Sequence, residues 1–360
     1  MSIYGFENVD KQKYVHYYIL KISFFIMEAF MKKQTLLVSA FLIALSAAFA
    51  LGGSDGASGK TYTLKLSTQL NETSVMVQGF KELAENVKTK SGGRLIIQVY
   101  PSAQLGTDED VIEQAIQGVN VCVLTDGGRM GNYVKDIGII GMAYFADSYD
   151  DVLKVTKGKT FDGWVKKLAN EDNIQILSFN WYDGARSFYT HKPVRTPADL
   201  KGLRIRTPGA PAWAESIAAL GATPIAMPWN DTYSGIQSKA LDGCEVQLTS
   251  AVPARLYEVV KYLDKTEHFQ LINGLIVGTK WFNTLPDDLK DLLVKETQAV
   301  GEKNARLVES KAAELESELV RQGITVVNVD KTPFKKAADA AYDKLGFTAL
   351  RKQIYQEIGK

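Results

Sequence analysis

The chain is poor in the residue types on which most metal sites and nucleophilic active sites depend. Its 360 residues include two cysteines and three histidines, and no cysteine–histidine cluster has the spacing of a zinc site. His191 and His268 stand in no metal-ligand or triad pattern, and neither a Walker loop nor a dinucleotide fingerprint occurs. We therefore expect no metal, no cofactor and no enzymatic activity, although a pair of catalytic carboxylates stays open as an alternative.

An excess of charge of one sign is also missing. Lysine and arginine number 42 against 41 aspartates and glutamates, so no overall field attracts nucleic acid or an anionic membrane. The hydrophobic share of 46% and the charged share of 23% are ordinary for a globular protein. The length is sufficient for two domains, and we expect no nucleic-acid partner.

The N-terminal apolar run is too short for a comfortable membrane span. Lys32 and Lys33 precede apolar residues 36–47, and Ala48-Phe49-Ala50 fits the small-x-small cleavage rule. This pattern predicts a signal peptide over 31–50, cut after Ala50, a linker over 51–60 and a periplasmic location. Residues 1–30 are then expected to be a non-native upstream extension, or alternatively part of a longer membrane anchor.

The two cysteines of the expected exported chain allow two interpretations. Cys122 and Cys244 lie in strand-like apolar contexts, so a disulfide is possible in an oxidising compartment, but we favour two buried thiols.

Gly52–Gly56 matches the Gly-x-Ser-x-Gly pattern of hydrolases. That motif requires a preceding strand and a following helix, which this segment lacks, so the match is a coincidence.

From residue 61 the sequence alternates between strand and helix patterns. Strands are expected at 62–67, 95–100, 119–124, 174–179, 202–207 and 243–248, and helices at 77–87, 108–118, 211–220 and 229–240. This succession predicts largely parallel strands with helices on both faces, and a ligand site beyond their carboxyl ends. A helical pattern over 286–322 predicts one helix of about 50 Å, or two helices broken near Gly301.

The most informative motif is Lys201–Pro208, in which Arg206 lies on a short strand that ends at Pro208. An arginine on a stiff strand offers a planar, permanently charged fork, which suits bidentate binding of a carboxylate. Further short motifs stand before and after it along the chain. In order they are Gly92–Leu95, Val99–Gly106, Asp183–Arg186, Lys192-Pro193, Asp199–Gly202, Gly221–Pro224, Trp229–Tyr233, Ala240–Gly243 and Leu256–Val259. Over roughly Thr61 to Gly323, this order resembles the solute-binding proteins of TRAP transporters, of the C4-dicarboxylate-binding (DctP) type.

The resemblance implies an α/β, periplasmic-binding-protein-like clamshell of two lobes. Each lobe would have a mixed or parallel sheet flanked by helices, and a long helix would cross both. The expected lobes are 61–183 plus 272–311, and 184–271 plus 312–360. The implied function is capture of an organic carboxylate and its delivery to the small and large membrane subunits of a TRAP transporter, by a monomer. A periplasmic sensor for a two-component system, and an enzyme acting on small acids, are the alternatives.

The resemblance also implies roles for individual residues. Arg206 would hold the carboxylate, and Arg204 would be its solvated neighbour. Arg186 would be a second arginine in the cleft, or else a hinge ion pair with Asp183 or Asp199. By the same resemblance, Trp229 is stacked on the ligand or else lies in the core. Other candidates come from their place after expected strands: Arg129 and Asp126 of the first lobe follow the strand 119–124, and Gln69 and Asn71 follow the strand 62–67, as contacts to ligand hydroxyls or as helix caps.

The chain departs from the family pattern at one candidate position. Where the family commonly has an asparagine near the ligand, this chain has Val246. The polar contact is therefore lost or passes to Gln247. This change raises doubt about a C4-dicarboxylate or sialic acid and fits a larger, more apolar or aromatic acid.

Overall fold

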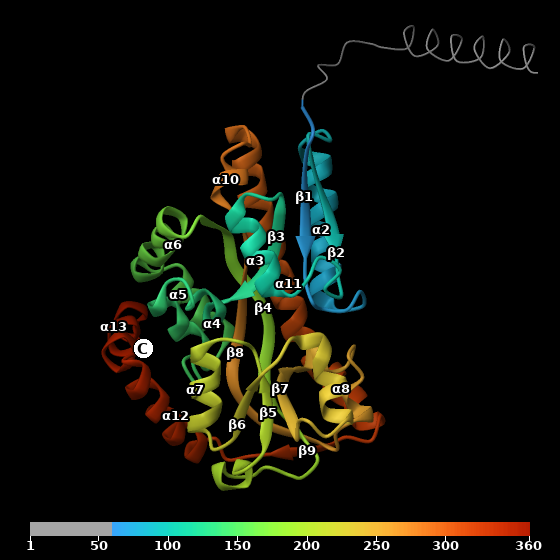
Figure 1. Cartoon of the computed structure of the whole chain (residues 1–360), viewed down its shortest axis with the longest axis vertical. Coiled ribbons are helices and arrows are strands. Elements are labelled where there is room, and N and C mark those ends of the chain that lie inside the picture. The colour runs from blue at the N-terminus through green and yellow to red at the C-terminus, as the bar shows by residue number, and fades with distance from the viewer. Residues whose placement is uncertain (1–59) are drawn as a thin grey trace, which may run out of the picture. The chain divides into compact units, whose positions relative to one another are not determined.

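The computed structural model describes residues 60–360, in which nine strands form one mixed sheet (Figure 1). Their order is β2-β1-β3-β8-β4-β7-β5-β6, with β9 paired to β8. The strands are β1 Tyr62–Ser67, β2 Leu95–Tyr100, β3 Val121–Asp126, β4 Ile174–Thr190, β5 Arg204–Thr207, β6 Thr223–Ala226, β7 Gly243–Gln247, β8 Tyr262–Gly278 and β9 Thr325–Asn328. The predicted signal peptide and linker, and the upstream extension, lie outside the described residues.

The α-helices cover the faces and ends of this sheet. They are α2 Val75–Lys90, α3 Asp108–Gln117, α4 Gly127–Met130, α5 Tyr149–Thr156, α6 Lys159–Glu171, α7 Pro211–Ala219, α8 Thr232–Gln237, α9 Leu248–Ala251, α10 Thr279–Phe282, α11 Asp287–Arg321, α12 Thr332–Leu345 and α13 Thr348–Ile358. Within residues 60–360, no helix has the length and apolarity that a membrane crossing requires.

Two long central strands, β4 and β8, connect the two ends of the sheet. On one side β1 pairs in parallel with β2 and β3, and β3 pairs antiparallel with the end of β8. On the other side β5 pairs in parallel with β6 and β7, and β7 pairs antiparallel with the end of β4. The β4–β8 ladder shifts register between Tyr182 and Gly184 and again between Arg186 and Phe188. Gly184 has φ +113°, a conformation that strongly favours glycine.

The long helix α11 runs unbroken for 35 residues along β4, so a break near Gly301 is ruled out (Figure 1). A Cβ at Gly301 would lie 2.5 Å from the Asn180 side chain and 2.8 Å from the indole nitrogen of Trp181. The glycine therefore permits close approach of the helix to β4 rather than interrupting it.

The cysteines are free and lie in different core clusters, as the interpretation as buried thiols predicts. Cys122 packs among Leu64, Phe80 and Leu275 in one cluster, and Cys244 packs with Tyr189 in another. Burial raises the pKa of Cys244 to about 12, so this thiol stays protonated and unreactive at neutral pH.

One helix of the fold differs from the sequence prediction. The helix expected at 229–240 is a 3₁₀ turn at Trp229–Asp231 followed by the short helix α8. The C-terminal helix α13 packs on α5, and Phe347 and Ile354 share a core cluster with Tyr149. The predicted lobe boundaries stay predictions.

Asp264 of β8 provides a test of pH-dependent stability. Its buried carboxylate accepts hydrogen bonds from Thr190 Oγ1 at 2.8 Å and from the Val194 amide at 2.9 Å, and burial raises its pKa to about 6. The folded pKa lies above the unfolded value of about 3.9, so this group's contribution to stability is greatest below pH 4 and is lost as pH rises through 6.

We expect Asp264→Asn to gain stability relative to the parent protein by up to about 3 kcal/mol between pH 4 and pH 7. The introduced amide can still accept from the Val194 amide and can donate to Thr190 Oγ1, whose own proton reaches the Lys192 carbonyl. Urea unfolding of both proteins at the two pH values measures the change. A stability difference that does not vary with pH would contradict it.

Candidate functional site

A cavity of about 60 Å³ lies where the strands β1, β3, β5 and β7 end. This volume is several times the roughly 10–15 Å³ that one water needs. The carboxyl ends of the strands are the position predicted for a ligand site. The lining residues are Thr68, Gln69, Leu70, Asp108, Leu124, Asp126, Arg129, Asp183, Arg186, Arg206, Pro208, Trp229, Val246, Gln247, Ser250, Leu271 and Asn273. We call this space the anion cavity, and it brings together all the predicted site residues except Asn71.

Arg206 is a buried cation without a carboxylate partner. It is 2% exposed, its Nε donates to the Met227 carbonyl at 2.8 Å, and its guanidinium lies 5.5 Å from the Trp229 ring centroid. Among residues 60–360 it forms no ion pair within 4.0 Å. Burial, and then the nearby charge of Arg186, lower its pKa to about 10, so the side chain is still charged at neutral pH. An unpaired buried charge costs several kcal/mol, so the position favours an anionic partner.

The strand around Arg206 fixes its position. Arg206 lies opposite Ile225 of β6 and Cys244 of β7, so β5 is held on both sides. Arg204, two residues earlier, is 43% exposed in its side chain and forms an ion pair with Asp242 at 2.9 Å. This agrees with the prediction that Arg204 is the solvated member of the pair.

Arg186 also lines the cavity but is neutralised by Glu245. Its Nε donates to one carboxylate oxygen at 2.5 Å, and its Nη2 donates to the other at 2.8 Å. Glu245 is fully buried, and burial raises its pKa even though Arg186 opposes the shift. The predicted alternative partners, Asp183 and Asp199, are both wrong, because the ion pair is with a residue of β7.

Gln247 takes part in the same buried network. Its Oε1 accepts from Arg186 Nη1 at 3.0 Å, and its Nε2 donates to Asp183 at 2.5 Å and to Ser250 at 2.7 Å. The side chain therefore positions Arg186 and Asp183, and its amide groups are already occupied. Val246 lines the cavity beside it, as an apolar side chain.

Arg129 is the most heavily compensated arginine of the cavity. It contacts Asp126 at 2.5 Å, Glu109 at 2.7 Å and Asp108 at 3.4 Å. Burial opposes its charge, but these carboxylates outweigh that effect and raise its pKa. Burial likewise opposes ionisation of Asp126, yet Arg129 and the Trp213 indole hold the pKa of Asp126 below its usual value.

Trp213, which was not predicted as a site residue, contacts both Asp126 and Arg186 of the cavity lining. Its Nε1 donates to Asp126 at 2.9 Å, and the Arg186 guanidinium lies 4.8 Å from its ring centroid. A Cβ on Gly128 would lie 2.1 Å from this nitrogen, which explains a glycine two residues after the end of β3. No pattern in the sequence distinguished this tryptophan from a core residue.

Gln69 bridges to the other side of the cavity, whereas Asn71 lies outside it. Gln69 Oε1 accepts from the Trp229 amide at 3.1 Å. Asn71 instead donates to the Pro253 carbonyl at 2.8 Å, and Ser74 caps the following helix. We therefore do not include Asn71 among the proposed ligand contacts.

Two amide groups at the cavity lack hydrogen bonds of ordinary length to any described residue. They are Gln69 Nε2 and Asn273 Nδ2, on side chains that are 3% and 5% exposed. A buried donor left without an acceptor costs about 1–3 kcal/mol, so both favour an oxygen-rich ligand. Asn273 was not predicted; its signal in the sequence is a single asparagine within the apolar run 271–277.

Comparisons with known proteins agree with this architecture. The family model described as "Bacterial extracellular solute-binding protein, family 7" (DctP) matches residues 66–348. The sialic acid-binding periplasmic protein SiaP of Vibrio cholerae is 30% identical over 280 residues, which are 78% of this chain and 87% of SiaP.

Two solved structures are similar over most of the described residues. A TRAP periplasmic solute-binding protein from Ochrobacterium anthropi with bound L-fuconate has a TM-score of 0.80 and 28% identity, covering 83% of this chain and 99% of that one. A TRAP periplasmic solute-binding protein from Escherichia fergusonii in an apo open structure has a TM-score of 0.72 and 31% identity, covering 82% and 99%.

These similarities confirm the predicted α/β clamshell with two lobes and a long crossing helix. Since the family model spans most of the chain, the predicted family is confirmed as well. The chain belongs to the bacterial extracellular solute-binding proteins of family 7, the binding proteins of TRAP transporters.

Proposed function

We propose that this chain captures a hydroxylated organic monocarboxylate in the anion cavity and delivers it, in the periplasm, to the membrane subunits of a TRAP transporter. The observation that carries this proposal is Arg206, a buried cation without an ion-pair partner among the described residues. A carboxylate could accept from both terminal N–H groups of its fork, beside a guanidinium that is itself 2% exposed. We propose that the chain acts by binding alone.

The balance of charges in the cavity supports one carboxylate rather than two. Arg186 is neutralised by Glu245, and Arg129 by three carboxylates. Among the arginines that line the cavity, Arg206 alone has no carboxylate partner among the described residues. Asp183 adds a further acid to the lining, with its pKa raised by burial to about 6. A second carboxylate on the ligand would lie near these acidic side chains, with no unpaired cation of the lining left to neutralise it. That is unfavourable in a buried site.

The polar groups around this charge support a hydroxylated ligand. Asn273 Nδ2, and Gln69 Nε2 apart from the interaction of its side chain with Asp108, lack hydrogen bonds of ordinary length, and an aromatic ring would supply neither with an acceptor. L-Fuconate and sialic acid, named for two similar proteins, are both hydroxylated carboxylic acids. These donors make a hydroxylated aliphatic acid a better candidate than the aromatic acid suggested by Val246.

Closure of two lobes is the proposed mechanism. The chain is more similar to the L-fuconate complex than to the apo open structure, although its sequence identity to the latter is higher. Hydrogen bonds from the Trp229 amide to Gln69 and from Trp213 Nε1 to Asp126 cross between the proposed lobes. Ligand contacts made by both lobes exist only when they are closed, so binding shifts the population towards that form. The register shifts in β4 and β8 are the proposed hinges.

A matched set of sugar derivatives tests this specificity. We expect aldonates to raise the melting temperature, because a ligand of the native state stabilises it by mass action. The corresponding aldoses and aldarates should bind at least about tenfold more weakly, a difference of about 1.4 kcal/mol, because the first lack a carboxylate and the second add one. Thermal shift followed by calorimetry measures this, and an aldarate binding as tightly as its aldonate would contradict the proposal.

A further inference from the structure

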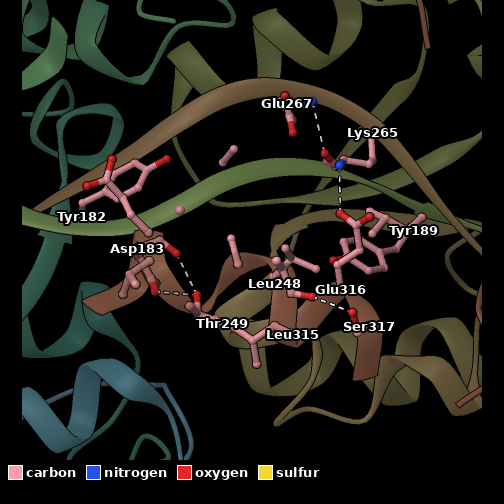
Figure 2. Close-up of a pocket in the computed structure, with 18 residues that line it drawn as sticks. Tyr182, Asp183, Tyr189, Leu248, Thr249, Lys265, Glu267, Leu315, Glu316 and Ser317 are labelled. Atoms are coloured by element: carbon pink, nitrogen blue, oxygen red, sulfur yellow. Dashed lines mark hydrogen bonds and ion pairs between the residues drawn. The ribbon is translucent and has the colours of Figure 1, made fainter. Parts of the chain in front are cut away.

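A second and much larger cavity, of about 580 Å³, lies between the strands β4 and β8 and the helix α11 (Figure 2). We call it the hinge pocket. Its lining residues are Tyr182, Asp183, Gly184, Ala185, Ser187, Tyr189, Leu248, Thr249, Leu263, Lys265, Glu267, Val308, Glu309, Ala312, Ala313, Leu315, Glu316 and Ser317. Its volume is within the range of about 300–1,000 Å³ typical of small-molecule sites. Asp183 is the only lining residue that it shares with the anion cavity.

The charged groups of the hinge pocket are mostly acidic. Asp183, Glu267, Glu309 and Glu316 line it, against a single lysine, Lys265. Lys265 pairs with Glu316 at 2.8 Å inside the pocket. The cations that pair with the other two glutamates, Lys331 with Glu267 and Arg306 with Glu309, are not part of the lining. The lining alone therefore holds more carboxylates than cations, and Lys331 and Arg306 offset two of them from outside the pocket. Such a lining does not suit an organic acid.

The remaining surface suits the apolar body of a small molecule. Leucine, valine and alanine side chains and two tyrosines contribute to the lining, namely Leu248, Leu263, Val308, Ala312, Ala313, Leu315, Tyr182 and Tyr189. Figure 2 shows Tyr189 beside Glu316 and Lys265 at one end of the pocket, and Asp183 with Thr249 at the other.

The hydroxyl of Tyr189 is a second and independent indication of a ligand. Tyr189 is 1% exposed, and its hydroxyl forms no hydrogen bond with any described residue. A buried hydroxyl left without a partner costs about 1–3 kcal/mol. A donor or acceptor bound next to Glu316 would remove that cost.

We propose that the hinge pocket binds a small organic cation, an ammonium group carried on an apolar or aromatic body. The ammonium pairs with Glu316 and approaches the Tyr189 hydroxyl, while the apolar body contacts the leucine and tyrosine side chains. The pocket rejects the acids that the anion cavity accepts, because its own carboxylates repel them. This site does not depend on the identity of the transported acid.

Benzylammonium is a suitable probe, with benzyl alcohol and benzoate as neutral and anionic controls of the same shape. We expect saturable changes in the amide NMR spectrum of the ¹⁵N-labelled protein, concentrated in residues 182–189, 263–267 and 308–317. Half-saturation is expected at or below about 1 mM, with both controls at least about tenfold weaker. Equal binding of benzyl alcohol, changes located elsewhere, or no saturation by about 10 mM would each overturn the proposal.

Two variants separate this site from a general effect of negative charge. Glu316→Gln should weaken benzylammonium binding at least about fivefold, by about 1 kcal/mol. Glu314→Gln removes the same charge two residues away on α11, outside the pocket lining, and should change binding little. Tyr189→Phe should also weaken binding without loss of folding, because it deletes a hydroxyl that has no partner. Equal losses of benzylammonium affinity in the two glutamate variants, or unchanged affinity in both Glu316→Gln and Tyr189→Phe, would refute the proposed cation site.

Discussion

Arg206→Lys is expected to weaken binding of the organic acid by about 2 kcal/mol, which is roughly thirtyfold in Kd. Lysine keeps the positive charge but replaces the planar fork with a point charge, so the paired N–H bonds to a carboxylate are lost. The Nε contact to the Met227 carbonyl, which orients the arginine, is lost as well. Isothermal titration calorimetry with the best aldonate from the thermal-shift comparison measures the change.

Arg204→Lys is the matched control, since it makes the same substitution two residues earlier on β5. Arg204 is half-exposed and pairs with Asp242 rather than lining the anion cavity. Its variant should bind the acid with nearly unchanged affinity. Equal affinities for the parent protein and Arg206→Lys would remove Arg206 from the proposed site.

Glu245→Gln is expected to lower the free energy of unfolding by about 3–5 kcal/mol, because it leaves the Arg186 guanidinium buried without its carboxylate. Glu245 is 0% exposed and accepts from Arg186 at 2.5 and 2.8 Å. Glutamine preserves the size of the side chain, so the change reports on charge rather than on a cavity. Urea unfolding at pH 7 measures the loss.

An exposed ion pair provides the comparison for this effect. Glu82 pairs with Lys303 at 2.8 Å, with side chains that are 38% and 70% exposed. Because solvent screens such pairs, Glu82→Gln should cost no more than about 1 kcal/mol. If Glu245→Gln were as mild as Glu82→Gln, Arg186 would have to be stabilised by something other than the pair with Glu245.

The sequence predicted the fold class, the family and several of the residues that line the anion cavity, because these depend on local patterns. Arg206 was identified by its place on an expected strand that ends before Pro208, and Asp126 by its place just beyond the expected strand 119–124; they lie on β5 and at the end of β3. Both are features of the chain over a few residues. The order of such motifs along the chain then indicated the family.

The partners of the site residues could not be predicted, because they are set by contacts between distant segments. Arg186 and Glu245 are 59 residues apart in sequence and meet only because β4 and β7 pair in one register. The strand β8 was missed since its pattern is interrupted by charged residues where the ladder shifts register. Trp213 likewise looks like a core residue until the other end of its hydrogen bond, Asp126, is known.

A crystal structure of the protein with a bound aldonate tests most directly whether Arg206 holds the ligand. We expect the carboxylate to lie in the anion cavity with two oxygens within about 3 Å of the Arg206 terminal nitrogens, and the hydroxyls to accept from Gln69 and Asn273. A carboxylate bound by Arg186 or Arg129 instead, with Arg206 making no contact to it, would contradict this mode of binding.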